Sequence, residues 1–194
     1  MTTITEDYTG KIVVVTGSSR GVGKLAANHF LTNGATVAGI SRGEGTIDNE
    51  NYHHYSIDIS DSKQVRNTFF KIGKEFKTVH IVVNNAAVLT SQYSLIMPAE
   101  DAEAMININL LGTFYVSREA AKLMKKSKFG RIINIGSMAS SLEPMGDSIY
   151  AASKAGVITL ANVMAKEFSG YNVTCNTLGI SAYETDMLNS HTDQ

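Results

Sequence analysis

Residues 12–23, IVVVTGSSRGVG, decide the fold of this chain. The run Ile12–Val15 is short and β-branched, which is typical of a strand buried inside a parallel sheet. After the glycines, apolar residues recur at helical spacing, at Leu25, Ala26, Phe30 and Leu31. A strand, a glycine turn and a helix in this order suit a dinucleotide, because the backbone can approach a pyrophosphate at the helix N-terminus. The spacing is not G-x-G-x-x-G, so an ordinary tight turn is the alternative for this motif alone.

Strands and helices are expected to alternate along the rest of the chain. Apolar runs predict strands at 12–16, 36–41, 53–57, 79–84, 130–136 and 171–177. Helical periodicity predicts helices at 21–33, 61–76, 99–126 and 149–168. This alternation predicts one α/β domain over residues 1–194, a Rossmann-like, doubly wound parallel sheet with helices on both faces. The polar segment 43–51 and the two prolines, Pro98 and Pro144, fall in predicted connections.

A tyrosine and a lysine form the second informative feature. Tyr150 and Lys154 are four residues apart, so they share one face of a helix if this segment is helical. A phenol, with a pKa of about 10, is a poor acid at neutral pH, but a nearby ammonium lowers that pKa. The pair can then pass a proton to or from a substrate oxygen. Such pairs also decorate ordinary helices, but the glycine turn and a serine upstream, Ser137, favour the catalytic interpretation.

Composition excludes several other classes of protein. The net charge of −1 suggests no nucleic-acid or anionic-membrane partner, and no apolar run approaches the length of a membrane span. The segment Met1–Thr9 is polar and acidic, unlike a secretory signal. A single cysteine, Cys175, suits a cytoplasmic protein and is expected to be a small apolar strand residue. His53 and His54 have no partners at metal-ligand spacing, so no metal site is predicted.

Together these motifs resemble the short-chain dehydrogenase/reductase family. Its members carry T-G-x-x-x-G-x-G after the first strand, N-N-A-G after the fourth, and a Ser, Tyr-x-x-x-Lys set. This chain has matching segments at 16–23 and 84–87, followed by Ser137, Tyr150 and Lys154. Asn109 stands where the family keeps a fourth catalytic residue, although Asn107 is close by. The resemblance covers residues 10–187 and is nearest to 3-oxoacyl-carrier-protein reductases and related ketone reductases.

The resemblance implies an enzyme that transfers a hydride between a nicotinamide cofactor and a ketone or secondary alcohol. Tyr150 would donate the proton, and Ser137 would donate a hydrogen bond to the same substrate oxygen. Lys154 would lower the pKa of the phenol and bind the nicotinamide ribose. Asn109 would hold a water that links Lys154 to bulk solvent. The partners are therefore a small-molecule carbonyl or alcohol substrate and further copies of the chain, in a homodimer or homotetramer.

The resemblance also implies a set of cofactor-binding residues. The pyrophosphate would lie on Gly17, Ser19, Arg20, Gly21, Val22 and Gly23. The adenosine would contact Asp58, Ile59, Asn85 and Ala86, and the nicotinamide end would contact Tyr150, Lys154 and Thr185. After the second strand, Arg42 replaces the acid that NAD-preferring sites usually carry, and with Arg20 it suits a 2′-phosphate. NADP(H) is therefore the predicted cofactor, and NAD(H) is the alternative.

Three departures from the family pattern keep other functions open. The N-N-A-G motif ends in Ala87, and Ile180-Ser181 replaces the Pro-Gly expected after the sixth strand. The chain stops at Gln194, before the substrate-covering segment and seventh strand that members usually add, so we expect a shortened sheet. A catalytically impaired, nucleotide-binding protein is therefore one alternative. A sugar-nucleotide epimerase or dehydratase, which shares Tyr-x-x-x-Lys, is another, although its glycine spacing and longer C-terminal domain differ.

Overall fold

A single parallel sheet forms the centre of the molecule. The computed structural model describes residues 6–181, so the predicted contact of Thr185 lies outside the described residues. Six strands are ordered β3-β2-β1-β4-β5-β6, and every neighbouring pair is parallel. They are β1 (Ile12–Thr16), β2 (Thr36–Ser41), β3 (Tyr52–Ser56), β4 (Ile81–Asn84), β5 (Gly130–Ser137) and β6 (Val173–Ile180). The predicted α/β fold class is confirmed.

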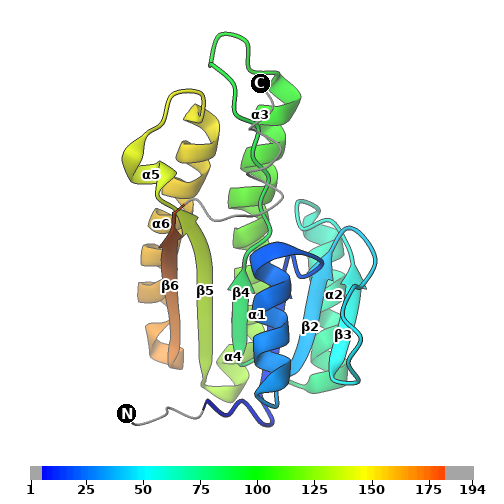
Figure 1. The fold of residues 1–194 in the computed structure, drawn as a ribbon. Coiled ribbons are helices and arrows are strands. Elements are labelled where there is room, and N and C mark those ends of the chain that lie inside the picture. Colours follow the sequence, from blue (N-terminus) through cyan, green and yellow to red (C-terminus); the bar gives the residue numbers. More distant parts are fainter. Residues whose placement is uncertain (1–5, 182–194) are drawn as a thin grey trace, which may run out of the picture.

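Helices cover both faces of this sheet. In Figure 1, α1 (Gly21–Thr32) lies in front of the strands, and α2 (Ser62–Phe76), α4 (Thr113–Ser127) and α6 (Ser148–Phe168) lie behind them. The remaining helical pieces are α3 (Ala99–Met105), the π-helix η1 (Ile106–Gly112), the single turn α5 (Ala139–Leu142) and the 3₁₀ turn η2 (Ser169–Tyr171). This is the doubly wound arrangement that the alternating pattern predicted.

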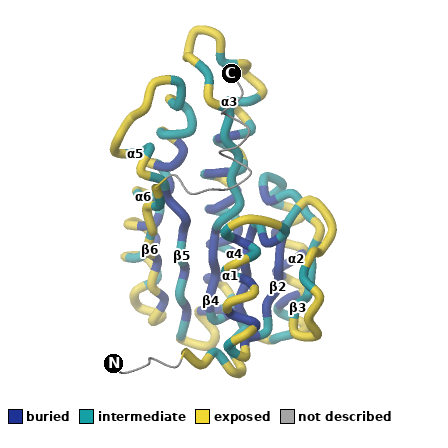
Figure 2. Tube along the Cα trace, viewed as in Figure 1, coloured by how far each residue is buried: buried dark blue, intermediate teal, exposed yellow. Residues whose placement is uncertain are grey.

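Two apolar clusters flank the sheet, one on each face. On the α1 side, Val13, Val15 and Val37 pack against Phe30 and Leu31. On the other side a larger cluster joins strand residues such as Val14 and Ile132 to α2, α4 and α6. Buried residues therefore follow the central strands, whereas the loops beyond their carboxyl ends are mostly exposed (Figure 2). Alternate residues of β1 point to opposite faces, so one β-branched run supplies both clusters.

The structure corrects some predicted boundaries. The helix predicted at 99–126 is three consecutive pieces, because the π-helix η1 interrupts it, and it ends at Ser127. The sixth strand runs from Val173 to Ile180 rather than over 171–177, because η2 occupies its expected start. The fourth strand begins at Ile81, two residues late. The π-helix η1 is only seven residues long. Over so short a stretch its apolar residues fit the periodicity of the α-helices on either side, so the sequence predicted one continuous helix.

The strand order creates a crevice at one end of the sheet. β1 pairs with β2 on one side and with β4 on the other, so the chain changes direction across the sheet between β1 and β4. Ligands of open α/β sheets bind at such a point, outside the carboxyl ends of the strands. The segments that follow β1, β2, β4 and β5 all meet at this end (Figure 1). The predicted glycine turn, Arg42 and Asn85 follow β1, β2 and β4, and Ser137 ends β5.

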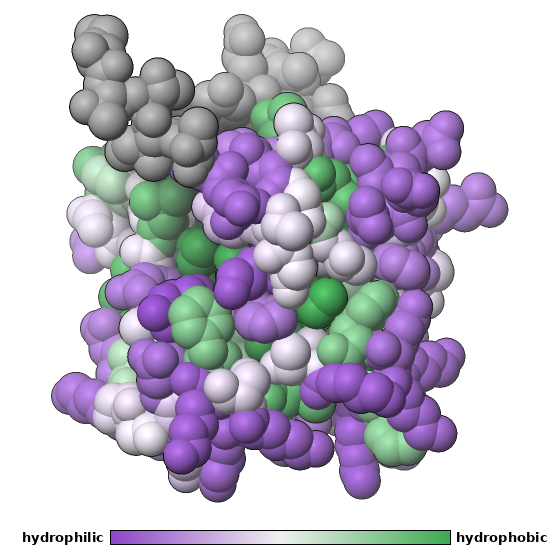
Figure 3. All heavy atoms as spheres, turned by 90° about the horizontal axis from the view of Figure 1, so that it is seen from below, coloured by the Kyte–Doolittle hydropathy of each residue, from purple (hydrophilic) through white to green (hydrophobic). Residues whose placement is uncertain are grey.

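The opposite end of the sheet, where the strands begin, holds none of the predicted functional residues that are described. Seen from the side where the strands begin, the surface is mostly hydrophilic with smaller hydrophobic areas between (Figure 3). His80 lies here and accepts a hydrogen bond from the Ile12 backbone through Nδ1 at 2.9 Å. Burial lowers the pKa of His80, so the imidazole stays neutral as this bond requires. Within residues 6–181 no helix is long and apolar enough to cross a membrane.

Candidate active site

The glycine turn after β1 is built so that its backbone stays uncovered. Gly17 and Gly21 have φ angles of +69° and +53°, a region that glycine adopts without a steric penalty. Gly23 is needed for a different reason, because a Cβ there would lie 2.2 Å from the Gly17 carbonyl oxygen. The turn therefore closes tightly onto the start of α1, where free N–H groups and the helix dipole favour an anion.

Thr16 and Asn85 fasten this turn to the neighbouring strand. The backbone N–H groups of Asn85 and Ala86 both donate to Thr16 Oγ1 at 3.0 Å. Asn85 Nδ2 donates to the carbonyl oxygens of Thr16 at 3.1 Å and Gly17 at 3.3 Å. Thr16 is almost fully buried, at 1% exposed. Its role was missed in the sequence, although a polar residue that closes an apolar strand just before the glycines is a signal that could have indicated it.

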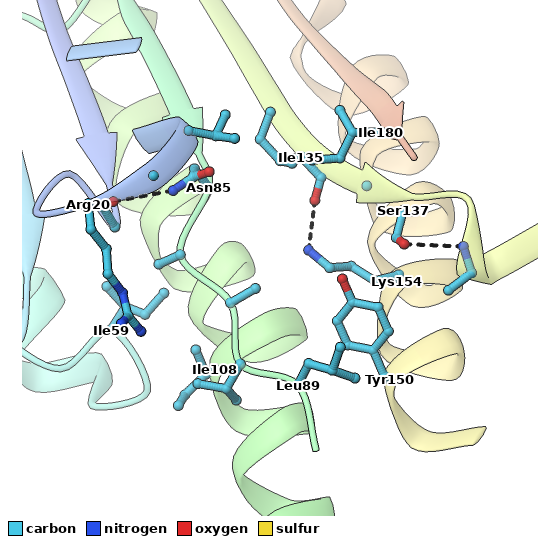
Figure 4. Close-up of a pocket in the computed structure, with 18 of the residues that line it drawn as sticks. Arg20, Ile59, Asn85, Leu89, Ile108, Ile135, Ser137, Tyr150, Lys154 and Ile180 are labelled. Atoms are coloured by element: carbon cyan, nitrogen blue, oxygen red, sulfur yellow. Dashed lines mark hydrogen bonds between the residues drawn. The ribbon is translucent and has the colours of Figure 1, made fainter. Parts of the chain in front are cut away.

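One cavity of about 820 Å³ joins the glycine turn to the predicted catalytic residues. In Figure 4, Arg20, Ile59 and Asn85 lie on one side of it, and Tyr150 and Lys154 lie opposite. The predicted site residues that line it are Gly17, Ser19, Arg20, Gly21, Val22, Arg42, Asp58, Ile59, Asn85, Ala86, Ser137, Tyr150 and Lys154. Gly23 and Asn109 do not line it. The tertiary structure thus brings together residues from segments spread over most of the sequence.

Ser137 and Tyr150 stand at the far end of this cavity. Ser137 is the last residue of β5, and its Oγ accepts a hydrogen bond from the Ala139 N–H at 3.1 Å. Tyr150 lies in the first turn of α6, two residues after its first residue. Burial raises the pKa of the Tyr150 phenol, a hydrogen bond with Ser137 partly opposes this, and the charge of Asp147 adds to the rise. The phenol is therefore protonated at neutral pH and available as a proton donor.

Lys154 lies one helical turn beyond Tyr150, inside the protein. Its Nζ donates a hydrogen bond to the Ile135 carbonyl oxygen at 2.8 Å and lies 5.8 Å from the centre of the Tyr150 ring. Burial lowers the pKa of Lys154 to about 8. The ammonium is thus fixed beside the phenol and is easily deprotonated. The predicted juxtaposition of the two side chains on one helical face is confirmed.

The predicted direction of the Tyr150 pKa shift is wrong for this structure. The sequence led us to expect that the Lys154 ammonium would lower the phenol pKa, but that pKa is raised. Burial disfavours the phenolate, and the hydrogen bond with Ser137 offsets only part of that rise in the phenol pKa. The burial of Lys154 disfavours its own charge as well. The spacing of two residues on a helix gives their proximity but not how much water they lose.

Asn109 lies beneath the cavity wall rather than in it. Its Oδ1 accepts from the Val88 N–H at 2.8 Å, and its Nδ2 donates to the Val88 carbonyl at 2.9 Å and to Ser153 Oγ at 3.1 Å. Asn109 belongs to the π-helix η1 and is 1% exposed. Its side chain is thus committed to the protein, and its proposed contact with a water stays a prediction.

The other end of the cavity carries positive charge. Arg20 and Arg42 are both exposed, and neither forms an ion pair within residues 6–181. Asp58 Oδ1 accepts from the Ser60 N–H at 2.8 Å and from the Ser60 hydroxyl at 2.7 Å, which fixes its carboxylate at the cavity edge. Free guanidinium groups suit a phosphate, and the uncovered glycine turn suits a pyrophosphate. The residues present therefore fit a dinucleotide.

Two of the three departures from the family pattern also lie in the cavity wall. Ala87 and Ile180 both line the cavity, and Ile180 pairs with Ser137 at the end of the β5–β6 ladder. Ile180 lies beside Ile135, above the Lys154 ammonium (Figure 4). Lys154 itself is only 4% exposed, and this burial lowers its pKa.

Comparisons with known proteins agree with this geometry. The sequence model for short chain dehydrogenases matches residues 11–194. The 3-oxoacyl-[acyl-carrier-protein] reductase FabG of Vibrio harveyi is 34% identical over 190 residues, which are 95% of this chain and 78% of that protein. The 3-oxoacyl-[acyl-carrier-protein] reductase MabA of Mycobacterium tuberculosis (strain H37Rv) is 36% identical over 180 residues, which are 93% of this chain and 72% of that protein.

A solved structure supports the fold independently. The crystal structure of NAD⁺-bound xylitol dehydrogenase superimposes with a TM-score of 0.86, covering 94% of this chain and 74% of that one. The two sequences are 22% identical, so the likeness is one of fold.

Proposed function

The chain belongs to the short-chain dehydrogenase/reductase family of NAD(P)-dependent oxidoreductases, and we propose that it interconverts a ketone and a secondary alcohol with NADP(H). One observation carries the proposal. Ser137, Tyr150 and Lys154 meet at one end of a cavity whose other end is the glycine turn. A dinucleotide that lies along this cavity would place its nicotinamide beside the phenol.

The proposed mechanism assigns one task to each side chain. When bound, the nicotinamide would supply the hydride to the carbonyl carbon or accept it from there. In the reducing direction Tyr150 transfers its phenolic proton to the carbonyl oxygen, and the Ser137 hydroxyl donates a hydrogen bond to the same oxygen as negative charge develops there. Lys154 stabilises the phenolate that remains, and its ammonium would also bind the nicotinamide ribose of the cofactor. Asn109 is a positioning residue, because its hydrogen bonds join the loop at Val88 to Ser153 of α6.

The cavity and the relatives together suggest the substrate class. The segments that follow β4 and β5 contribute Leu89, Met138, Leu142 and Pro144 to the cavity wall, so part of that wall is apolar. Such a wall suits a hydrocarbon chain next to the carbonyl. The curated relatives are 3-oxoacyl-[acyl-carrier-protein] reductases, so we propose a 3-oxoacyl thioester or a similar ketone as the first substrate to test. We further propose that the enzyme works as a homodimer or homotetramer.

A screen of NADPH oxidation tests this function. Acyl thioester, sugar-nucleotide and small ketone substrates are offered to the purified protein, and turnover is expected with a ketone. Tyr150→Phe keeps the ring but removes the transferable proton, so kcat should fall by about 10²–10⁴-fold while NADPH still binds. Tyr171→Phe, in the 3₁₀ turn η2 and outside the cavity lining, is the matched control. NADPH binding without turnover of any ketone would instead favour a catalytically impaired protein.

A further inference from the structure

A chain of hydrogen bonds runs beneath the cofactor end of the cavity, from the glycine turn to the loop after β2. Ser18 Oγ lies 2.9 Å from the Tyr52 hydroxyl, and that hydroxyl lies 3.0 Å from His54 Nδ1. His54 Nε2 lies 2.8 Å from the Gly43 carbonyl oxygen and 3.4 Å from Ser41 Oγ. Two neighbouring strands and two loops are thus linked through two side chains of β3.

The direction of each bond follows from the last acceptor. The Gly43 carbonyl can only accept, so His54 Nε2 carries the hydrogen. In the neutral imidazole Nδ1 is then an acceptor, so the Tyr52 hydroxyl donates to it. Burial raises the pKa of Tyr52, so its proton is retained. The Tyr52 oxygen, which donates its hydrogen to His54, can accept a hydrogen bond from the Ser18 hydroxyl. Each of these side-chain groups then has a hydrogen-bond partner.

The neighbouring residues make room for this chain. Gly39 of β2 lies under the Tyr52 ring, and a Cβ at Gly39 would lie 2.1 Å from the Tyr52 hydroxyl oxygen. Only a glycine therefore lets the phenol cross β2 to reach Ser18, which is fully buried. Tyr52 and His54 share one face of β3, because alternate residues of a strand point the same way. His53 and Tyr55 point to the other face, where both contact Glu75.

The two ends of the chain differ in how much other support they have. The glycine turn is also fixed by Thr16 and Asn85, and its Gly17 N–H donates to the Ile40 carbonyl at 2.7 Å. The loop after β2 is held mainly by side chains. Ser56 Oγ donates to the Arg42 carbonyl at 2.9 Å, and Thr46 Oγ1 donates to the Ser19 carbonyl at 2.7 Å. The Gly43 carbonyl accepts from His54 at 2.8 Å and from Ser41 Oγ only at 3.3 Å, so the imidazole gives it the shorter bond. Loss of the imidazole should therefore loosen the segment that carries Arg42 more than it disturbs the glycine turn.

We propose that Tyr52 and His54 are positioning residues that fix Arg42 for the 2′-phosphate of NADP(H) and so set the preference for that cofactor over NAD(H). The inference rests on the proposed NADP(H) preference. NADH has no 2′-phosphate and gains little from a well-placed Arg42, whereas NADPH gains a charge-assisted hydrogen bond whose strength depends on geometry. A loosened Arg42 should thus weaken NADPH binding selectively.

Titration of the substrate-free protein with each cofactor tests the inference. Dissociation constants for NADPH and NADH are measured by the fluorescence of the bound reduced cofactor, so the readout does not depend on turnover. In His54→Ala and Tyr52→Phe the preference for NADPH should fall by about tenfold, mainly through weaker NADPH binding. His54→Gln, whose amide can still donate to Gly43, should retain part of the preference. His53→Ala and Tyr55→Phe make the same chemical changes on the opposite face and should leave it unchanged.

The outcomes separate this inference from the proposed function. If the parent protein binds NADH as tightly as NADPH, the proposed cofactor preference fails before any variant is considered. If the parent prefers NADPH and the variants keep that preference, or lose affinity for both cofactors equally, the positioning role is overturned. Should His54→Ala fail to fold by circular dichroism, Tyr52→Phe decides alone, because it keeps the ring over Gly39.

Discussion

Asn109 and the Val88 backbone form a two-point hydrogen-bonded pair, at 2.8 Å to the Val88 N–H and 2.9 Å to the Val88 carbonyl. The pair joins the π-helix η1 to the loop after β4, which lines the cavity at Val88. A third bond reaches Ser153, the neighbour of Lys154 in α6. One buried amide thus connects the cavity wall to the helix that carries the proposed catalytic pair.

Asn109→Ala should therefore weaken both folding and catalysis. It removes the partner of the half-buried Val88 N–H and carbonyl and the bond to Ser153, and each lost hydrogen bond destabilises by about 0.5–1.5 kcal/mol. We expect the free energy of unfolding to fall by about 3 kcal/mol in urea denaturation, together with a lower kcat. Asn107→Ala, an exposed asparagine of the same π-helix, should change neither quantity. Equal stability of the two variants would contradict the role given to Asn109.

The pH dependence of ketone reduction should report the raised pKa of Tyr150. A proton donor must be protonated, so kcat in the reducing direction should stay level through neutral pH and fall only as the pH passes that raised pKa. The charge of Asp147 contributes to the rise, so Asp147→Asn should move the falling limb to lower pH. An unchanged limb in Asp147→Asn, measured without cofactor limitation, would show that another group titrates.

Lys154 should make the stability of the cofactor-free protein depend on pH. Its pKa is lowered from 10.5 to about 8, so between these values the unfolded chain holds a proton that the folded protein has released. Stability therefore rises with pH across this window, and the burial penalty is fully present below pH 8. Between pH 8 and 10.5 the free energy of unfolding of the parent, measured in urea, should rise by about 3 kcal/mol relative to that of Lys154→Met.

Lys166→Met is the control for that measurement. Lys166 is exposed near the end of the same helix, so the difference between this variant and the parent should not change with pH. If the difference in unfolding free energy between the parent and Lys154→Met is also independent of pH, the Lys154 ammonium is hydrated in solution.

Arg42→Asp should reverse the preference for NADPH. The substitution removes a guanidinium suited to the 2′-phosphate and introduces an acid that can accept from the 2′-hydroxyl of NADH. We expect NADPH to bind about tenfold or more weakly and NADH to bind at least as well as before, measured by cofactor fluorescence. Arg66→Asp, on the exposed side of α2, makes the same charge change and should leave both affinities almost unaltered.

The sequence alone determined the order and type of the main elements. Six apolar runs and four amphipathic stretches were enough to predict a parallel α/β sheet. The spacing of apolar residues along a strand or helix shows whether one or both of its faces are buried. The family motifs also named part of the cavity lining, including Gly17, Tyr150 and Lys154, but not its apolar wall. Strands, helices and motifs depend on residues that are near one another in the sequence, and so they could be predicted before the structure was known.

The tertiary structure decided how those residues are fixed and charged. The link from Ser18 through Tyr52 and His54 joins segments more than thirty residues apart, and the Thr16–Asn85 contact spans 69 residues. No local pattern encodes such contacts, because they depend on which strands become neighbours in the sheet. The raised pKa of Tyr150 and the lowered pKa of Lys154 likewise follow from burial by β5 and the loops around the cavity. The motifs named the groups of the site, the order of the strands brought these groups together, and the loss of water around them set the direction of their pKa shifts.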